Sequence, residues 1–206
     1  MIGFNKPKGI NLKTEEEIKF IKEAGRMLRE VKNIIKQNIV EGITTKELDS
    51  IAENAIYKLG GKPGFKGLYG FPGTICSSFN EEIVHGIPSS RKIKNGDILS
   101  VDCGVIYEEF NSDSAFTVSI GNIPSNIKTL INTTEEALKL GIQEAKPGNR
   151  IGDIGHSIEK YSLSKGFSVV KEYVGHGIGK KLHEDPQIPN YGQKSSGPKI
   201  LSGMAL

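Results

Sequence analysis

Residues 98–118 read ILSVDCGVIYEEFNSDSAFTV and predict two β-strands joined by a tight turn, each strand carrying one aspartate. Side chains alternate between the two faces of a strand. A turn centred on Tyr107 and Glu108 therefore places Asp102 directly opposite Asp113, on the same face. Like charges in that position repel, so either one carboxyl has a strongly raised pKa or a cation lies between the two. The alternative is a solvent-facing hairpin whose two acids are unrelated.

The composition describes an ordinary globular chain. Its 206 residues can bury a full core and favour a single domain spanning residues 1–206. The net charge of +3 is too small, and the basic residues too scattered, to predict nucleic-acid recognition. No apolar run approaches the roughly eighteen residues of a membrane span, and residues 1–9 lack a signal-peptide core. Two cysteines in dissimilar contexts, Cys76 and Cys103, favour free thiols in a reducing cytoplasm.

Two pairs of helices are expected. The capping boxes at Thr14–Glu17 and Thr44–Glu47 open helices that end near Gln37 and before Gly60-Gly61. In the second half, helices are expected over Ser125–Ala145 and Ile151–Lys165. A shift of 106 residues aligns the two pairs, with Gly42 on Gly148 and Gly60 on Gly166, which predicts an internal duplication of a helix–helix–strand unit whose halves face each other.

The remaining segments are expected to be short strands and loops. The sequence predicts strands over Thr74–Phe79, Ile83–His85 and Phe167–Val174, and a glycine-rich loop over Lys62–Pro72.

A second cluster of chemically active side chains reads GHGIG (175–179) and HEDP (183–186). Glycines on both sides of His176 let the backbone approach a site closely, and a neutral imidazole binds divalent transition metals. The alternative is a pair of loop histidines without a chemical role. His85 is either a satisfied core histidine or a site residue, and His156 is expected on a polar helix surface. The segment lacks the spacing of a phosphate-binding loop.

Taken in order, His85, Asp102, Asp113, His176 and His183 resemble the type I methionine aminopeptidases. The resemblance rests on KTEEEIKFIKEAGRML near the start and on three further segments, CSSFNEEIVHGIP (76–88), SVDCGVIYEEFNSDSAFTV (100–118) and GHGIGKKLHEDPQIPNYG (175–192). It covers nearly the whole chain, including the eleven-residue step between the aspartates. The implied fold class is α+β: a pita-bread fold with a pseudo-two-fold antiparallel sheet covered by two pairs of helices, here lacking the last strands. Residues 1–206 then form a single, incomplete catalytic domain.

The resemblance implies a site with two divalent metal ions, of cobalt, manganese, iron or zinc. Asp102 binds one ion, Asp113 bridges both and His176 binds the other. A hydroxide held between the ions attacks the first peptide carbonyl. His183 contacts the substrate carbonyl, and His85 contacts the scissile amide nitrogen.

The resemblance also implies an apolar slot for the substrate methionine. Its expected residues are Phe65, Leu68, Phe71, Cys76 and Leu182. Leu68 and Phe71 stand where some relatives carry tyrosines, so the chain departs from the family pattern there.

The largest departure lies after Gly203-Met204. The family continues there with two metal-binding glutamates, one of them the expected general base, whereas the sequence ends at Leu206. We therefore expect a truncated chain, either a fragment or the product of an interrupted reading frame. Weak metal binding and little or no turnover are expected of it.

The implied function is removal of the N-terminal methionine from newly made polypeptides. The implied partners are nascent polypeptide N-termini and the ribosome, with no nucleic-acid recognition and no membrane, for a monomer in the cytoplasm. One alternative is an X-Pro aminopeptidase or prolidase of the same fold. The other is a non-catalytic module that binds peptides or the ribosome.

Overall fold

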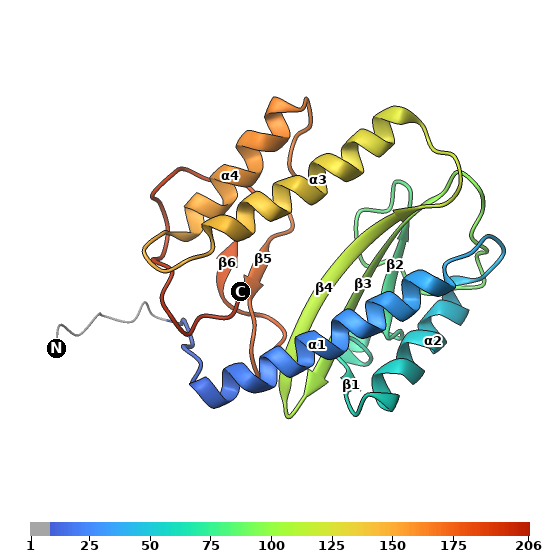
Figure 1. Cartoon of the computed structure of the whole chain (residues 1–206), viewed down its shortest axis with the longest axis horizontal. Helices are drawn as coiled ribbons and strands as arrows, with labels where there is room; N and C mark the ends of the chain where they lie inside the picture. The colour runs from blue at the N-terminus through green and yellow to red at the C-terminus, as the bar shows by residue number, and fades with distance from the viewer. Residues whose placement is uncertain (1–8) are drawn as a thin grey trace. The chain divides into compact units, whose positions relative to one another are not determined.

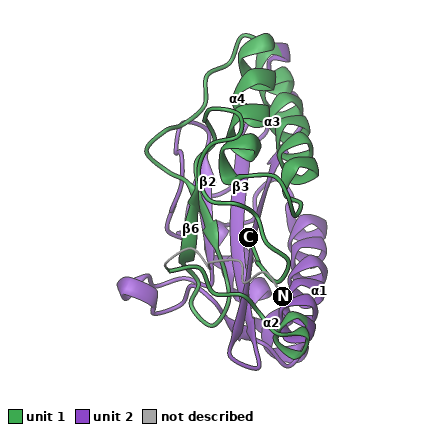
Figure 2. Cartoon of the chain, turned by 90° about the vertical axis from the view of Figure 1, so that its left-hand side faces the viewer, with its two compact units in different colours: residues 1–18, 126–206 green, residues 19–125 purple. Residues whose placement is uncertain are grey.

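The computed structural model, drawn in Figure 1, describes residues 9–206. These residues divide into two compact units (Figure 2). Unit 1 comprises residues 9–18 and 126–206, and unit 2 comprises residues 19–125. The prediction that residues 1–9 lack a signal-peptide core falls mostly on residues 1–8, which lie outside the described residues. Between residues 9 and 206, no helix combines the length and the apolar character needed to cross a membrane.

Unit 2 is built from a pair of helices and a four-stranded antiparallel sheet. The elements along this part of the chain are α1 (Glu15–Asn38), α2 (Thr45–Lys58), β1 (Lys62–Pro63), the 3-10 turn η1 (Leu68–Gly70), β2 (Ile75–Phe79), β3 (Ile98–Tyr107) and β4 (Phe110–Ser119). Strand β3 is central: β4 pairs along one edge of it, and β1 and β2 pair with successive parts of the other edge.

Both predicted capping boxes are present. The Thr44 hydroxyl accepts a hydrogen bond from the Glu47 backbone N–H at 3.2 Å, and the Glu47 carboxylate accepts one from the Thr44 N–H at 2.8 Å. The same two bonds join Thr14 and Glu17 at the start of α1. These reciprocal bonds satisfy backbone donors that have no partner within the helix, which is why both helices begin where the sequence predicts.

The core of unit 2 lies between the helix pair and one face of the sheet. From β3, it contains Leu99, Val101, Cys103 and Val105, all fully buried. These residues confirm the predicted alternation along the strand, because the intervening Asp102 points to the other face. The helices contribute Met27, Leu28, Val31, Ile35, Leu48, Ala52, Ala55 and Ile56. The core thus fixes which face of the hairpin the aspartates occupy.

The register of the β3–β4 hairpin corrects one prediction. The turn is at Glu108-Glu109, one residue later than expected, with φ angles of 45° and 67°. Asp102 consequently pairs with Ala115, and Asp113 pairs with Gly104. The two aspartates are diagonal neighbours rather than directly opposite, so that prediction is wrong. They still share a face, because moving the turn by one residue shifts the register by two.

Unit 1 contains a second helix pair and a small two-stranded sheet. Its elements are α3 (Ser125–Glu144), α4 (Ile151–Ser164), β5 (Gly175–Gly177) and β6 (Glu184–Ile188). Strands β5 and β6 are antiparallel, with an irregularity in register between His176 and Gly177. The apolar cluster under α4 is small and contains the buried residues Ile151, Ile154 and Ile200.

The helix bounds support the predicted duplication. A shift of 106 residues places α2 residue for residue on α4 and the last residue of α1 on the last residue of α3. The aligned glycines share a conformation as well: φ is 93° at Gly42 and 101° at Gly148, and 88° at Gly60 and 83° at Gly166. Positive φ is unfavourable for side chains with a Cβ, so glycine is suited to the same turns in both halves.

Two predicted strands are absent, and one predicted loop contains short elements of secondary structure. His85 has a φ of 62°, which is incompatible with a strand over Ile83–His85. The segment Phe167–Val174 forms no ladder with any residue in the described range, although its composition favours a strand, because strand formation depends on a pairing partner. The predicted loop Lys62–Pro72 includes β1 and η1.

Candidate active site

The aspartate face of unit 2 holds two half-buried carboxylates. Asp102 and Asp113 lie on adjacent strands as diagonal neighbours, which corresponds to a Cβ separation of about 7 Å. Gly104, directly opposite Asp113, carries no side chain on this face. The carboxylates are therefore close enough for an ion between them to contact both.

Two residues of the predicted methionine slot border these carboxylates. Cys76 pairs directly with Asp102 in the β2–β3 ladder, so both side chains lie on the same face. The buried ring of Phe65 covers Gly104, because a Cβ added at that glycine would lie 2.8 Å from the Phe65 Cε1 atom. An apolar ring and a thiol thus lie on the same face as the acids.

The thiols are protonated at neutral pH. Burial, together with the charges of Asp102 and Asp113, raises the pKa of Cys76 to about 12. Burial also raises the pKa of Cys103, which lies on the opposite, helix-covered face. Because the thiolate is the nucleophilic form, neither cysteine is suited to nucleophilic catalysis.

The loop that carries Phe65 also carries the next two predicted slot residues. Backbone hydrogen bonds from Leu68 N–H to Phe65 O at 3.0 Å and from Phe71 N–H to Leu68 O at 2.9 Å fold the loop tightly. Both Leu68 and Phe71 are half-buried. Three of the five expected slot residues therefore belong to a single turn.

His85 lies in an exposed loop beside β2. The next residue, Gly86, accepts a hydrogen bond from Ser77 N–H at 2.8 Å, and its own N–H donates to Ser78 Oγ at 3.1 Å. A Cβ at Gly86 would collide with the Ser77 carbonyl. This close approach holds the loop against the strand that contains Cys76. His85 is exposed, which excludes the alternative prediction that it is a buried core histidine.

Unit 1 brings the two remaining predicted site histidines together. The ring centroids of His176 and His183 lie 4.5 Å apart, with an angle of 72° between the ring planes. The Nδ1 atom of His176 lies 2.9 Å from the Gly177 carbonyl oxygen. Since a carbonyl oxygen only accepts, Nδ1 carries the proton in this bond. In this tautomer a neutral ring carries its lone pair on Nε2, the atom through which such a histidine binds a metal ion.

A cavity of about 640 Å³ contains both histidines. It is lined by Gly9, Asn11, Val174, His176, Lys180, Lys181, His183, Glu184, Asp185 and Gln187. Leu182, the fifth expected slot residue, is buried within the same loop. The glycines of this loop are required by close packing, because a Cβ at Gly177 would collide with the Asp185 carbonyl oxygen.

Sequence reasoning missed an ion pair in this loop. Lys13 Nζ lies 2.6 Å from Glu184 Oε2, and the two side chains are only 2% and 10% exposed. Each residue sits in a segment that contributed to the resemblance, yet neither suggested the other, since they are 171 residues apart in sequence.

The donor atoms suit a divalent metal ion, although residues 9–206 contain no preformed cluster of three His, Cys, Asp or Glu side chains able to hold one. In unit 2, two half-buried carboxylates share a face; in unit 1, His176 has the tautomer of a metal ligand. Oxygen and imidazole nitrogen donors are those that divalent transition metals accept. The predicted ligands therefore fit a metal by chemical type.

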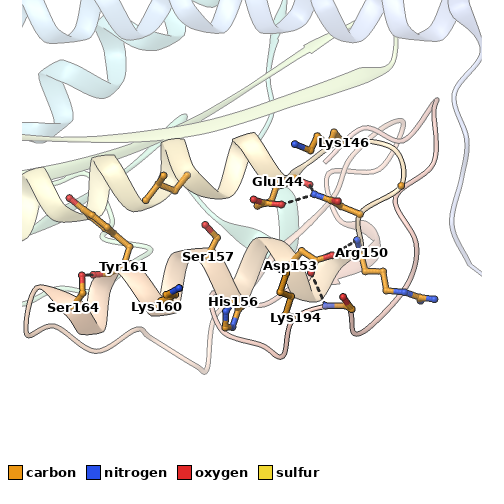
Figure 3. A pocket seen from close by; sticks show the side chains of 14 residues that line it. Glu144, Lys146, Arg150, Asp153, His156, Ser157, Lys160, Tyr161, Ser164 and Lys194 are labelled. Carbon is orange, nitrogen blue, oxygen red and sulfur yellow. Dashed lines mark hydrogen bonds between the residues drawn. The ribbon is translucent and has the colours of Figure 1, made fainter.

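A separate cavity of about 620 Å³ lies along α3 and α4 and is shown in Figure 3. His156 lines it and is half-buried, whereas the sequence suggested a surface position. The Asp153 carboxylate at its edge accepts hydrogen bonds from the backbone N–H groups of Ser195 and Arg150. None of the predicted catalytic, metal-binding or slot residues lines this cavity.

Comparison with known proteins identifies the class. Residues 19–206 match the profile of metallopeptidase family M24, which covers most of the chain and parts of both units. The chain therefore belongs to metallopeptidase family M24.

The most similar relatives refine this assignment. Methionine aminopeptidase 1 of Bacillus subtilis is 52% identical over 94% of this chain and 78% of its own length. The crystal structure of methionine aminopeptidase from Thermotoga maritima aligns with a TM-score of 0.92 at 41% identity, covering 95% of this chain and 79% of that chain. These matches confirm the predicted resemblance and the pita-bread fold.

The proline-specific alternative is a more distant relation. Prolidase from Pyrococcus furiosus aligns with a TM-score of 0.81 at 25% identity, covering 94% of this chain but 55% of its own. The fold is thus shared, while sequence and length favour the methionine aminopeptidases.

Proposed function

We propose that the chain acts as a metal-dependent aminopeptidase that removes the N-terminal methionine of newly made polypeptides. The observation that carries the proposal is the aspartate face of unit 2, where Asp102, Asp113, Cys76 and Phe65 lie together. Acidic oxygen donors bordered by an apolar ring suit both a metal and a methionine side chain. The family relationship supports the same chemistry.

In this proposal two divalent ions, of cobalt, manganese, iron or zinc, occupy the site. Asp102 would hold one ion, Asp113 would be shared by both, and His176 would hold the second through Nε2. A divalent ion supplies the Lewis acidity that polarises the scissile carbonyl. Asp102 and Asp113 hold fixed negative charge for the ions, and the Gly177 carbonyl holds the His176 ring in the required tautomer.

The remaining predicted residues orient the substrate. Phe65, Leu68, Phe71, Cys76 and Leu182 form the proposed slot for the methionine thioether. His183 donates a hydrogen bond to the substrate carbonyl, and His85 contacts the scissile amide nitrogen. The protonated thiol of Cys76 makes it an apolar wall in this slot rather than a charged one.

We further propose that residues 1–206 serve one catalytic domain, because the family match spans parts of both units. The proposed substrates are nascent polypeptides, and we propose that the protein acts on them in the cytoplasm, near the ribosome and as a monomer.

Peptide hydrolysis tests the function. The purified chain is incubated with excess manganese or cobalt and with either Met-Ala-Ser or Ala-Pro-Phe. We expect slow, metal-dependent release of methionine from Met-Ala-Ser, above the metal-free blank, lost in Asp113→Asn and retained in the control Glu108→Gln at the hairpin tip. Preferential cleavage of Ala-Pro-Phe would instead assign the chain to the proline-specific enzymes.

A further inference from the structure

The Lys13–Glu184 ion pair differs from the ion pairs on the protein surface. Lys13 Nζ donates to Glu184 Oε2 at 2.6 Å and to the Asn11 carbonyl at 2.9 Å, with both charged side chains almost fully buried. By contrast, the Lys66–Glu53 pair has the same length, but its side chains are 44% and 23% exposed. A buried charge without its partner is costly, so the geometry of the first pair is strongly constrained.

The carboxylate of this pair belongs to the histidine loop. Glu184 directly follows His183 in sequence and pairs in the β5–β6 ladder with Gly177, which directly follows His176. Its other oxygen, Oε1, accepts a hydrogen bond from the Lys181 N–H at 3.2 Å. Glu184 is therefore connected to both histidines through the backbone.

The ammonium group comes from the segment before α1. The Lys13 N–H donates to the Gly203 carbonyl at 2.7 Å, which fixes the backbone there. Gly9 and Asn11, just upstream, line the cavity that contains His176 and His183. The ion pair thus joins one wall of the cavity to the loop that presents the two imidazoles.

The backbone of the histidine loop packs closely against the pair. A Cβ added at Gly179 would lie 2.5 Å from both Lys13 Cε and Glu184 Oε1. The loop backbone at Gly179 therefore rests directly on the paired charges. Without the ammonium group, the Glu184 carboxylate can regain solvation only by turning toward water, and that movement pulls on His183 next to it.

We propose that Lys13 and Glu184 are positioning residues whose buried ion pair sets the spacing and orientation of the His176 and His183 rings. The inference deepens the proposed function, which assigns the two imidazoles to the metal and to the substrate carbonyl. The ion pair acts through the loop backbone rather than on the substrate, and a loosened pair leaves a site that is present but misaligned.

Nuclear magnetic resonance of the metal-free chain tests the proposal without requiring turnover. The readouts are the ring chemical shifts of His176 and His183 and the nuclear Overhauser effect between the two rings. They are recorded for wild type, Lys13→Met, Lys13→Arg and the surface control Lys66→Met, each well below its unfolding midpoint. We expect Lys13→Met to shift both rings and to weaken the inter-ring effect by at least about threefold, since that effect falls with the sixth power of distance and a loosened site moves by about 1 Å.

Lys13→Arg restores the charge and should recover much of the wild-type signal, and Lys66→Met should match wild type throughout. Wild-type ring signals in folded Lys13→Met would overturn the proposal and leave a purely structural ion pair. If Lys13→Met does not fold, Glu184→Gln, which keeps the shape and removes the negative charge, is judged by the same criteria. Failure of metal binding at Asp102 and Asp113 would refute the proposed function but leave this ring geometry measurable.

Discussion

The aspartate hairpin and the histidine loop hold their functional side chains by different means. In unit 2, β3 and β4 pair over ten residues each, and the helix-covered face of β3 is fully buried. In unit 1, β5 and β6 have only three and five residues, an irregular register and a small apolar cluster nearby. The helix pairs are related by the same 106-residue shift, so the difference lies in the site segments themselves.

This contrast shows two ways of fixing the position of functional side chains. The hairpin uses a hydrogen-bonded ladder over an apolar core, which determines the face on which each side chain lies. The loop instead uses glycines in close contact and one buried ion pair, so its order depends on a few contacts. We therefore expect the arrangement of the hairpin in unit 2 to depend on many residues. The arrangement of the histidine loop in unit 1 should depend on a few positions.

The largest difference in unfolding free energy between two matched variants is expected from breaking the buried and the exposed ion pair. Lys13→Met leaves the Glu184 carboxylate buried and unpaired, which costs about 3–5 kcal/mol of unfolding free energy. Lys66→Met removes an exposed pair of equal length and is expected to cost about 0–1 kcal/mol. Urea unfolding monitored by circular dichroism measures both. Equal losses in the two variants would contradict the distinction between the buried and the exposed pair.

Truncating a core side chain should lower the free energy of unfolding more in unit 2 than in unit 1, by a smaller difference than that between the two ion-pair variants. Leu99 is 0% exposed in the large cluster under the sheet, and Leu99→Ala is expected to cost about 3–5 kcal/mol. Ile154 is 7% exposed in the small cluster of unit 1, and Ile154→Ala is expected to cost about 2 kcal/mol. If Ile154→Ala lost more unfolding free energy than Leu99→Ala in the same assay, the core of unit 1 would contribute more to stability, contrary to this prediction.

The smallest effect concerns a pair of helix-capping acids related by the duplication. Hydrogen bonds from Ser195 and Arg150 N–H groups lower the pKa of Asp153, and hydrogen bonds from Thr44 lower the pKa of Glu47, at the equivalent position of α2. A lowered folded-state pKa gives stability that is present above the unfolded-state pKa, about 4, and is lost as pH falls through the folded-state value.

Asp153→Ala and Glu47→Ala should therefore each lower the thermal midpoint at pH 7, by about 1–2 °C. The difference in thermal midpoint between wild type and each variant should become smaller as the pH is reduced from 5 to 3. Thermal unfolding followed at several pH values measures it. A gap that widens in acid would mean that these carboxylates do not stabilise their helices in the charged form.

Much of the fold could be predicted because its signals are local. The capping boxes at Thr14 and Thr44 mark helix starts through residues three apart, and the strand alternation around Asp102 marks a buried face. The exact register could not be predicted. Two-residue hairpin turns with positive φ usually carry Asn-Gly or Asp-Gly, and nothing in Glu108-Glu109 indicates that conformation.

The residue types of the site could be predicted, but the residues that hold them in position could not. The resemblance supplied the aspartates and histidines, whereas Lys13 and Glu184 are ordinary charged residues whose pairing exists only in the folded loop. The segment Phe167–Val174 shows the converse problem, since a favourable composition does not provide a pairing strand.

The most direct test of the central claim is a calorimetric titration of the metal-free chain with manganese. Wild type should bind the ion, Asp113→Asn should weaken binding by at least about 100-fold, and the control Asp153→Asn should bind as wild type does. The size of this loss follows because Asp113 is proposed to bridge both ions. No binding by wild type, or equal binding by wild type and Asp113→Asn, would contradict a metal site on the aspartate face.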